Sequence, residues 1–358
     1  MIESFEISNY RSFKDVKVRD CRTVNLVVGD NGSGKTALLE ALFLVAGVSP
    51  ELISKTRVWR GYEGSRFAGT RDDIIQSVFG DLFYNFDLKL KPKINLRGDQ
   101  KGETRRLEIA YVPTGTKRIR PPSRDGKIRQ VAAENIVDRL RFDYNISNHG
   151  DFTVVPEFNE EQIVFNSPSD AVVSASFHAS MRNPSTGEMA SRFSKLSVNF
   201  EARRFIETFC SHFPQVRDIS LELWGGNPML YAEVDGIKDR IPLSNISGGM
   251  NKFASILLSI AHQRNGVVII DEIENGFYYE RMKDIWKTII NFSNEYNVQL
   301  FVSTHSSECI SAFRSAIYDS QVKDIKLLRT VMKNNETIVR AIEGGSFINS
   351  IDHNIEIR

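Results

Sequence analysis

A glycine-rich stretch near the N-terminus has the residues needed to bind a phosphate group. Residues 29–36 fit the spacing G-x-x-x-x-G-K-[ST]. Glycines let the backbone wrap around a phosphate, so that successive N–H groups and the start of the following helix point at it. Lys35 would reach the β- and γ-phosphates, and the Thr36 hydroxyl would ligate Mg²⁺. The residues predicted to contact the nucleotide here are Asn31, Gly32, Ser33, Gly34, Lys35 and Thr36.

Two adjacent acids could supply a metal ligand and a general base. Asp271 and Glu272 follow the run 266–270, which has the composition of a buried strand. In a parallel sheet, phosphate ligands bind at the carboxyl ends of the strands. Each buried charge is costly to remove from water unless it is paired or metal-bound. We therefore expect Asp271 to hold Mg²⁺, directly or through water, and Glu272 to orient and deprotonate the attacking water.

One histidine stands where it could act on the terminal phosphate. His305 follows a second apolar run, residues 298–304, and is predicted to sense or stabilise the γ-phosphate. Its neighbours Thr304 and Ser306 raise the alternative of a Ser-His hydrolase. That class is disfavoured because the chain has no nucleophile elbow and its acids are already assigned to the metal. The remaining histidines are predicted to be structural or exposed: His149, His178, His212, His262 and His353.

A second candidate anion site lies just before the acidic strand. Ser247 has the character of an N-cap, and Gly248 and Gly249 leave the start of the following helix bare. One folded domain has little use for two bare phosphate-binding helix ends. Two copies placed head to tail would bring this segment of one subunit against the nucleotide held by the other. The sequence therefore predicts an ATP-sandwich homodimer, or a higher homo-oligomer built on it.

The elements around these motifs predict an α/β fold. A β-branched strand over residues 23–28 and a helix-period pattern over 37–45 flank the glycine-rich loop. These flanking elements disfavour the alternative that the segment is an ordinary glycine-rich turn that contains Lys-Thr by chance. Residues 1–20 alternate as two short strands. A helix over 189–214 is expected to end at Pro214, and the strands of a hairpin follow at 216–224 and 229–234.

The predicted domain organisation has one split core and one insertion. Residues 1–50 and 195–358 form the nucleotide-binding core, and residues 51–194 form a strand-rich insertion. The insertion contains the loop 114–130, which has six basic residues against one acid and could contact a nucleic acid backbone or an acidic partner. A solvated loop without a partner is the other interpretation. No heptad pattern lasts long enough to predict a coiled-coil arm.

Composition limits the class of protein. The net charge of +1 gives no bulk attraction to nucleic acid, so any such contact must come from a local patch. The three cysteines are Cys21, Cys210 and Cys309, too far apart to indicate a disulfide framework or a zinc site. The N-terminus lacks the pattern of a signal peptide, and no apolar run approaches the ~18 residues that span a bilayer. We expect a cytoplasmic protein without a membrane contact.

The motifs in this order resemble the ABC-type ATPase heads of the RecF and SMC class. More closely, they look like the stand-alone ATPases related to overcoming-lysogenization-defect (OLD) proteins, labelled AAA15 or AAA21. The resemblance covers roughly 1–50 and 195–358. It is carried by Asn-Tyr-Arg-Ser-Phe (9–13), the glycine-rich loop, Ile-Pro-Leu-Ser (241–244), Ile-Ile-Asp-Glu-Ile-Glu-Asn-Gly (269–276), Phe-Val-Ser-Thr-His-Ser-Ser-Glu (301–308) and the terminal Glu-Ile-Arg. It implies a P-loop NTPase fold of the ABC/SMC type with an antiparallel β-lobe.

The resemblance also implies roles for single residues. Arg11 would touch a nucleotide phosphate, residues 247–249 would act in trans as the signature segment, and residues 274–276 would form the D-loop. His305 would be the switch histidine. Relatives commonly have Leu-His-Tyr where this chain has Phe-Tyr-Tyr at 277–279, so the dimer-facing loop is expected to differ in detail. The glutamine that helps to ligate Mg²⁺ has no motif of its own, and Gln76 is our candidate.

The implied function is a Mg²⁺-dependent ATPase that dimerises around ATP and switches a partner protein. The family points to bacterial anti-phage defence, with a nuclease or toxin effector encoded nearby. The chain itself lacks the acidic cluster of a TOPRIM nuclease after His305. Two alternatives remain: a RecF-like repair ATPase that clamps duplex DNA, and a nucleotide-gated scaffold with negligible turnover. A GTPase is disfavoured because no Asn-Lys-x-Asp motif occurs, and a transporter head because the insertion is too large.

Overall fold

The computed structural model describes most of the 358-residue chain. The described residues are 1–48, 71–99, 102–111, 140–147, 149–158, 163–165, 175–180, 185–320 and 324–346. The basic loop at 114–130 and the terminal Glu-Ile-Arg lie outside these ranges, so the predictions made for them are not addressed by the structure.

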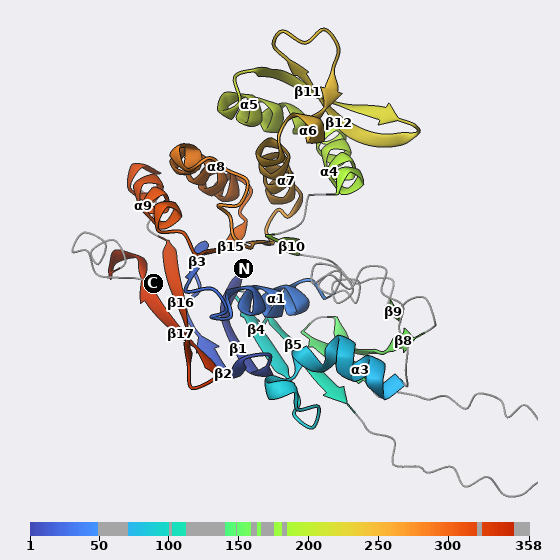
Figure 1. Cartoon of the computed structure of the whole chain (residues 1–358), viewed down its shortest axis with the longest axis vertical. Coiled ribbons are helices and arrows are strands. Elements are labelled where there is room, and N and C mark those ends of the chain that lie inside the picture. Colours follow the sequence, from blue (N-terminus) through green and yellow to red (C-terminus); the bar gives the residue numbers. More distant parts are fainter. Residues whose placement is uncertain are drawn as a thin grey trace, which may run out of the picture.

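A six-stranded sheet carries the glycine-rich loop and the acidic strand (Figure 1). Its order is β10-β14-β15-β3-β16-β17, and all neighbours are parallel except the last pair. The strands are β3 (Val24–Val28), β10 (Ala175–His178), β14 (Val267–Ile270), β15 (Gln299–Thr304), β16 (Ile325–Lys333) and β17 (Glu336–Glu343). Residues of β3, β14 and β15 are buried throughout, as expected for central strands that are covered on both faces.

This sheet separates two hydrophobic cores. Side chains alternate between its faces, so Leu26 and Ile270 belong to one core while Val27 and Ile269 belong to the other. Helices α7 (Gly248–His262), α8 (Met282–Glu295) and α9 (Ser307–Ser320) cover the first face. Helix α1 (Lys35–Ala46) covers the second, and Figure 1 shows it between the two large sheets.

The second large sheet is antiparallel, with order β2-β1-β4-β5-β6-β7. Its strands are β1 (Ile2–Tyr10), β2 (Phe13–Val18), β4 (Lys93–Gly98), β5 (Thr104–Tyr111), β6 (Leu140–Ile146) and β7 (Gly150–Val154). Helix α1 packs on β4 and β5 as well as on the parallel sheet. Smaller elements complete this lobe: α3 (Arg71–Phe79), the short helices Gly80–Leu82 and Tyr84–Phe86, and the pair β8 (Pro156–Phe158) and β9 (Ile163–Phe165).

Except for the separate pair β8 and β9, the described strands of residues 51–194 belong to sheets that also contain strands from outside this range. Strands β4 to β7 continue the sheet that β1 and β2 begin, and β10 adds the edge strand next to β14. Strand pairing thus joins segments far apart in sequence, which local patterns do not reveal. The division of the chain into a core and an insertion stays a prediction.

A third unit stands at the far end of the molecule from the antiparallel sheet (Figure 1). It contains α4 (Thr186–Val198), α5 (Ala202–His212), β11 (Val216–Trp224), β12 (Asn227–Val234), β13 (Ile241–Pro242) and α6 (Leu243–Ile246), and it continues into α7. The predicted single helix over 189–214 is two helices, broken at Phe200, whose φ is +61°. The predicted hairpin is present, and its turn is Gly225-Gly226, where both φ values are positive.

Among the described residues, no helix combines the length and the apolar character needed to cross a lipid bilayer.

Candidate functional site

The glycine-rich loop joins β3 to the first turn of α1. Gly34 caps the helix with φ +96°, and Lys35 is its first residue. The Lys35 Nζ donates to the carbonyl oxygens of Gly29 at 2.8 Å and Asp30 at 2.9 Å. Burial lowers the pKa of Lys35, while nearby acids, Glu272 first among them, oppose that shift. The ammonium is thus held inside the loop that it is predicted to share with phosphate oxygens.

Packing under the loop explains why Gly29 has no side chain. A Cβ on Gly29 would lie 2.4 Å from the carbonyl oxygen of Thr330 on β16, and the φ of Gly29 is +149°. Both features exclude other residues without a shift of backbone. The Ser33 Oγ lies 2.6 Å from the Thr330 Oγ1, so β16 supports the loop through hydrogen bonding as well as contact.

Two of the predicted Mg²⁺ ligands, Thr36 and Asp271, are hydrogen-bonded to each other. The Thr36 Oγ1 donates to Asp271 Oδ2 at 2.9 Å, and the Ser303 Oγ donates to the other carboxylate oxygen at 2.6 Å. Burial raises the pKa of Asp271, against the opposing effect of these two hydroxyls. Mg²⁺ usually takes one or two protein oxygens and completes its shell with water and substrate phosphates. A hydroxyl and a carboxylate side by side fit that requirement.

No larger metal cage replaces this pair. Within the described ranges, no group of three or more His, Cys, Asp and Glu side chains is arranged to hold a metal ion. Ser303 was not predicted from the sequence, although it lies near the end of the same apolar strand that led to His305. The sequence feature that could have identified Ser303 is a hydroxyl near the carboxyl end of a buried strand, next to the strand that Asp271 follows.

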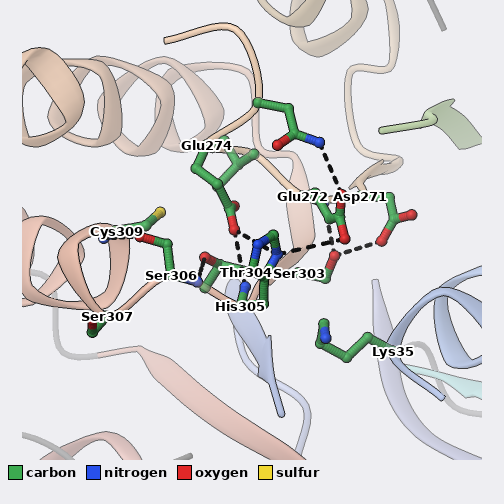
Figure 2. Close-up of polar contacts among 12 residues, drawn as sticks. Lys35, Asp271, Glu272, Glu274, Ser303, Thr304, His305, Ser306, Ser307 and Cys309 are labelled. Atoms are coloured by element: carbon green, nitrogen blue, oxygen red, sulfur yellow. Dashed lines mark hydrogen bonds and ion pairs between the residues drawn. The ribbon is translucent and has the colours of Figure 1, made fainter. Parts of the chain in front are cut away.

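Glu272 has an unusual backbone conformation for a non-glycine residue. Its φ is +47°, in the left-handed region, and its N–H donates to the Ser303 Oγ at 2.8 Å. The Asn275 Nδ2 donates to Glu272 Oε2 at 2.8 Å. The carboxylate is therefore held from its own loop while its backbone is held from β15, as Figure 2 shows. Strained backbone that the surroundings maintain is common at functional sites.

His305 lies between two acids (Figure 2). Its Nδ1 is 3.1 Å from Glu274 Oε1 and 3.5 Å from Glu272 Oε1, and its backbone N–H donates to Glu274 Oε1 at 2.9 Å. The structure thus brings His305 to the predicted general base. Glu274 fixes the position of the histidine, a role that the sequence alone did not indicate.

The predicted signature segment starts α7. Ser247 and Gly248 are exposed, and the Ser247 side chain makes no capping bond, so the helix N-terminus is bare. Gly249 is buried, and a Cβ there would lie 2.4 Å from the carbonyl oxygen of Gly276. Gly248 has no neighbour within 4 Å of its Cβ position. Packing within the chain accounts for the glycine at 249 and leaves the one at 248 without such a reason.

Lys252 is a second residue that the sequence analysis missed. It lies one turn after Gly248 on α7, and its Nζ donates to the main-chain oxygens of Glu272, Ile273 and Asn275 at 3.0, 3.3 and 2.9 Å. Burial lowers the pKa of Lys252 to about 8, and the surrounding acids, Glu274 first, oppose the shift.

Two predicted ligands make other contacts in this structure. Both terminal nitrogens of the Arg11 guanidinium are engaged, at 2.8 Å from Glu40 and 2.6 Å from Asp81, and its side chain is 7% exposed. A nucleotide contact by Arg11 would require these pairs to open, so that role stays a prediction. Gln76 is exposed on α3, because Ile75, Val78 and Phe79 face the core of the antiparallel lobe. Its amide lies against Gly80, and the structure does not bring it to Thr36 and Asp271.

Comparison with known proteins supplies the family. The model of the family AAA_21, described as "AAA domain, putative AbiEii toxin, Type IV TA system", matches residues 24–311. The chain belongs to this family. The match runs from β3 to α9 and so includes the glycine-rich loop, the signature segment, the acidic strand and His305. Of the two family labels that the sequence suggested, the match supports AAA21.

Individual relatives of this AAA_21 member agree with that assignment. An "ATP/GTP phosphatase" of Helicobacter pylori is 24% identical over 339 residues, which make up 88% of each chain. A RecF protein of Idiomarina loihiensis is 46% identical, but over 44 residues that make up 12% of each chain.

Solved structures agree on the fold. An SMC head bound to the C-terminal winged-helix domain of ScpA is similar over 96% of this chain and 99% of that one, with a TM-score of 0.56 at 14% identity. An SMC head from Pyrococcus furiosus bound to the C-terminal domain of ScpA has a TM-score of 0.54 at 12% identity. The predicted α/β fold of the ABC/SMC type is therefore confirmed. Family, fold and site together make the chain an ATPase of this type.

Proposed function

We propose that this chain is a Mg²⁺-dependent ATPase whose complete active site forms between two copies. The observation that supports it most directly is the hydrogen bond of 2.9 Å between Thr36 and Asp271. It joins the glycine-rich loop to the acidic strand, with Glu272 as the next residue. A phosphate held by the loop would therefore lie between a metal site and a candidate base.

Each residue has a distinct task in this mechanism. Lys35 turns from the loop carbonyls toward phosphate oxygens and neutralises their charge. Thr36 and Asp271 would hold Mg²⁺, which when bound offsets the negative charge of the phosphates. Glu272 orients a water molecule on the γ-phosphate side and accepts its proton. His305, beside Glu272, is placed to donate a hydrogen bond toward the phosphoryl group as charge develops on it.

The composite site rests on the exposed start of α7. Gly248 is exposed to solvent. The hydroxyl of Ser247 beside it makes no capping hydrogen bond, so the backbone N–H groups at the start of α7 are uncapped. Backbone N–H groups at such an end favour an anion. No contact within its own chain requires a glycine at position 248. A glycine is expected there if another molecule must approach the backbone closely. The γ-phosphate bound in a second copy has the required charge and would close a symmetric dimer.

We further propose that ATP-dependent dimerisation switches a partner protein in bacterial defence. The family description, which names a putative toxin of a toxin–antitoxin system, supports a setting in which such a switch restrains or releases an effector. A relation to OLD proteins and an effector encoded nearby, a nuclease or toxin, belong to this proposal. A RecF-like DNA clamp is the weaker alternative, because the RecF proteins compared match at most 115 residues, or 31% of this chain.

Substitution of Glu272 tests the hydrolase proposal. Glu272→Gln keeps the shape of the side chain and the acceptor for Asn275 but removes the base, so kcat should fall by about 10²- to 10⁴-fold. ATP should still bind, because the glycine-rich loop is intact, and the ATP-bound dimer should last longer. Turnover in steady state, nucleotide binding and dimer lifetime by light scattering are the measurements.

The matched control is Glu207→Gln, which changes an exposed carboxylate on α5. It should behave as the unmodified protein in all three assays. Unchanged turnover and dimer lifetime in Glu272→Gln would reject hydrolysis by this residue and favour a nucleotide-gated scaffold.

A further inference from the structure

Lys252 makes an unusually complete set of hydrogen bonds for a lysine. Its three ammonium hydrogens have three acceptors within 3.3 Å, and all are main-chain carbonyl oxygens of the segment 272–275. A lysine ammonium offers three donors and no acceptor. The Nζ also lies 5.6 Å from the centre of the Phe277 ring. Lys252 therefore holds the backbone of this segment and does not form an ion pair with one side chain.

The segment that Lys252 holds needs such support. Glu272 stands in the left-handed region with φ +47°, a conformation that costs free energy unless its surroundings maintain it. From β15, the Ser303 hydroxyl accepts the Glu272 N–H at 2.8 Å. From α7, the Lys252 Nζ donates a hydrogen bond to the Glu272 carbonyl oxygen at 3.0 Å. The two polar groups of the Glu272 backbone are thus fixed from opposite elements.

The carboxylate of Glu272 is linked to the same lysine through Asn275. The Asn275 Nδ2 donates to Glu272 Oε2 at 2.8 Å, and the Asn275 carbonyl accepts from Lys252 at 2.9 Å. Removing the ammonium would free the backbone of both residues at once. The backbone of Glu272 and the amide of Asn275 would then no longer be held in place, and these two set the direction of the Glu272 side chain.

The first turn of α7 touches this segment at a second point. Gly249 packs against the carbonyl oxygen of Gly276, where even a methyl group would not fit. Lys252 follows Gly248 by four residues, so it lies one helical turn from the bare N-terminus. Any displacement of the start of α7 is therefore passed to residues 272–276 by one tight contact and three hydrogen bonds.

We propose that Lys252 is a positioning residue that holds Glu272 in its reactive placement and couples that placement to the N-terminus of α7. The proposal rests on the proposed role of Glu272 in activating water. It adds that the signature segment of a subunit acts on the base of its own chain, besides contacting the nucleotide of the other. Contact of Gly248 with a phosphate in one site would thus stabilise the Glu272 segment that belongs to the second site.

Lys252→Met tests this coupling. Methionine fills most of the space of the lysine stem but cannot donate to the three carbonyls. We expect kcat to fall by about 10- to 100-fold, as misplacement of a reacting group does. KM and nucleotide affinity should change little, because Lys35 and Thr36 are untouched. Lys252→Arg keeps a charged donor and should recover part of kcat, which a loss of packing alone would not explain.

A double substitution separates positioning from general damage to the fold. If Lys252 acts through Glu272, the residual turnover of Glu272→Gln should not fall further when Lys252→Met is added. Lys195→Met, an exposed lysine on α4, is the matched control and should leave turnover and melting temperature unchanged. If Lys252→Met fails to fold, Lys252→Gln, which still donates two hydrogen bonds, takes its place in the same comparison.

The outcomes distinguish this inference from the proposed function. Reduced turnover in Glu272→Gln with normal kcat in Lys252→Met would overturn the positioning role and leave the ATPase mechanism in place. Additive losses in the double variant would also overturn it, since Lys252 would then act independently of Glu272. Normal turnover in Glu272→Gln would remove the proposed function and this inference together.

Discussion

At the scale of single residues, Asp271 shows how the site is prepared before a nucleotide binds. Each carboxylate oxygen accepts one hydroxyl hydrogen bond, from Thr36 and from Ser303. These bonds satisfy a buried acid whose pKa burial raises. A hydroxyl that already lies 2.9 Å from the carboxylate needs little rearrangement to share a metal ion with it.

A second buried residue at this scale predicts a dependence of stability on pH. Burial lowers the pKa of His178 to about 3, with Arg192 and Lys252 adding to the shift. The His178 Nε2 lies 2.8 Å from the Ser259 Oγ. The folded-state pKa lies below the unfolded value of about 6.5, so the unfolded state binds more protons between these values. Stability should be complete above about pH 6.5 and fall as the pH approaches 3.

The measurement is the free energy of unfolding by denaturant at a series of pH values. His178→Asn should reduce the slope in this window by up to about 1.4 kcal/mol per pH unit. His149→Asn removes an exposed imidazole and is the control that should keep the slope. An equal slope in the protein and in His178→Asn would contradict the placement of His178.

At the scale of elements, strands β16 and β17 shape the nucleotide loop from below. Thr330 of β16 lies against Gly29 and Ser33, and Thr337 of β17 lies against Gly34. The Thr337 Oγ1 also donates to the Ser12 Oγ at 2.7 Å, which ties the loop to the turn between β1 and β2. The helix that begins at Lys35 is thus positioned by the C-terminal hairpin as well as by β3.

Gly29→Ala tests this support. The added methyl group would meet the carbonyl oxygen of Thr330 and force the residue away from its positive φ. We expect a loss of roughly 1–3 kcal/mol in stability, together with a large loss of ATP affinity. Gly102→Ala, at a turn with φ +85° and no neighbour within 4 Å, measures the cost of the backbone conformation alone. Melting temperature and fluorescent nucleotide binding report both effects, and equal behaviour of the two variants would contradict the packing argument.

Elements that end at a polar residue could be predicted from the sequence. The apolar runs before Asp271 and His305 were predicted as strands, and the polar residues after them marked where each strand ends. The four-residue strand β10 could not be assigned to the sheet, because its partner β14 lies far along the chain. The break at Phe200 also escaped prediction, because the apolar positions follow the helical period within each of the two helices.

At the scale of the whole molecule, the fold brings the glycine-rich loop, the two acids after β14 and His305 to one edge of the parallel sheet, and the signature segment begins α7. Spacing identified the residues that we propose bind phosphate and metal, because backbone geometry within one loop determines their chemistry. It could not reveal Lys252 or Glu274, because their partners depend on how α7 packs on the sheet and on the pairing of β14 with β15. Nor could it show that the Arg11 guanidinium pairs with Glu40 and Asp81.

The central claim, an active site completed by a second copy, predicts complementation between two inactive variants. Lys35→Ala removes the phosphate ligand of the loop. Gly248→Asp places a negative charge where the γ-phosphate of the other subunit would lie, although an acid at a helix N-terminus favours the fold. Gly187→Asp makes the same change in the first turn of α4, at another exposed glycine without neighbours, and should leave turnover intact.

The decisive measurement is ATP turnover in an equal mixture of Lys35→Ala and Gly248→Asp subunits. Each variant alone should be inactive, and the mixture should recover up to about a quarter of the unmodified rate, since half of the randomly formed dimers are mixed and each has one intact site of two. Coupling through Lys252 would lower this figure, because the Glu272 of the intact site belongs to the subunit that carries Gly248→Asp. A mixture as inactive as its components, with dimers present, would contradict an active site shared between subunits.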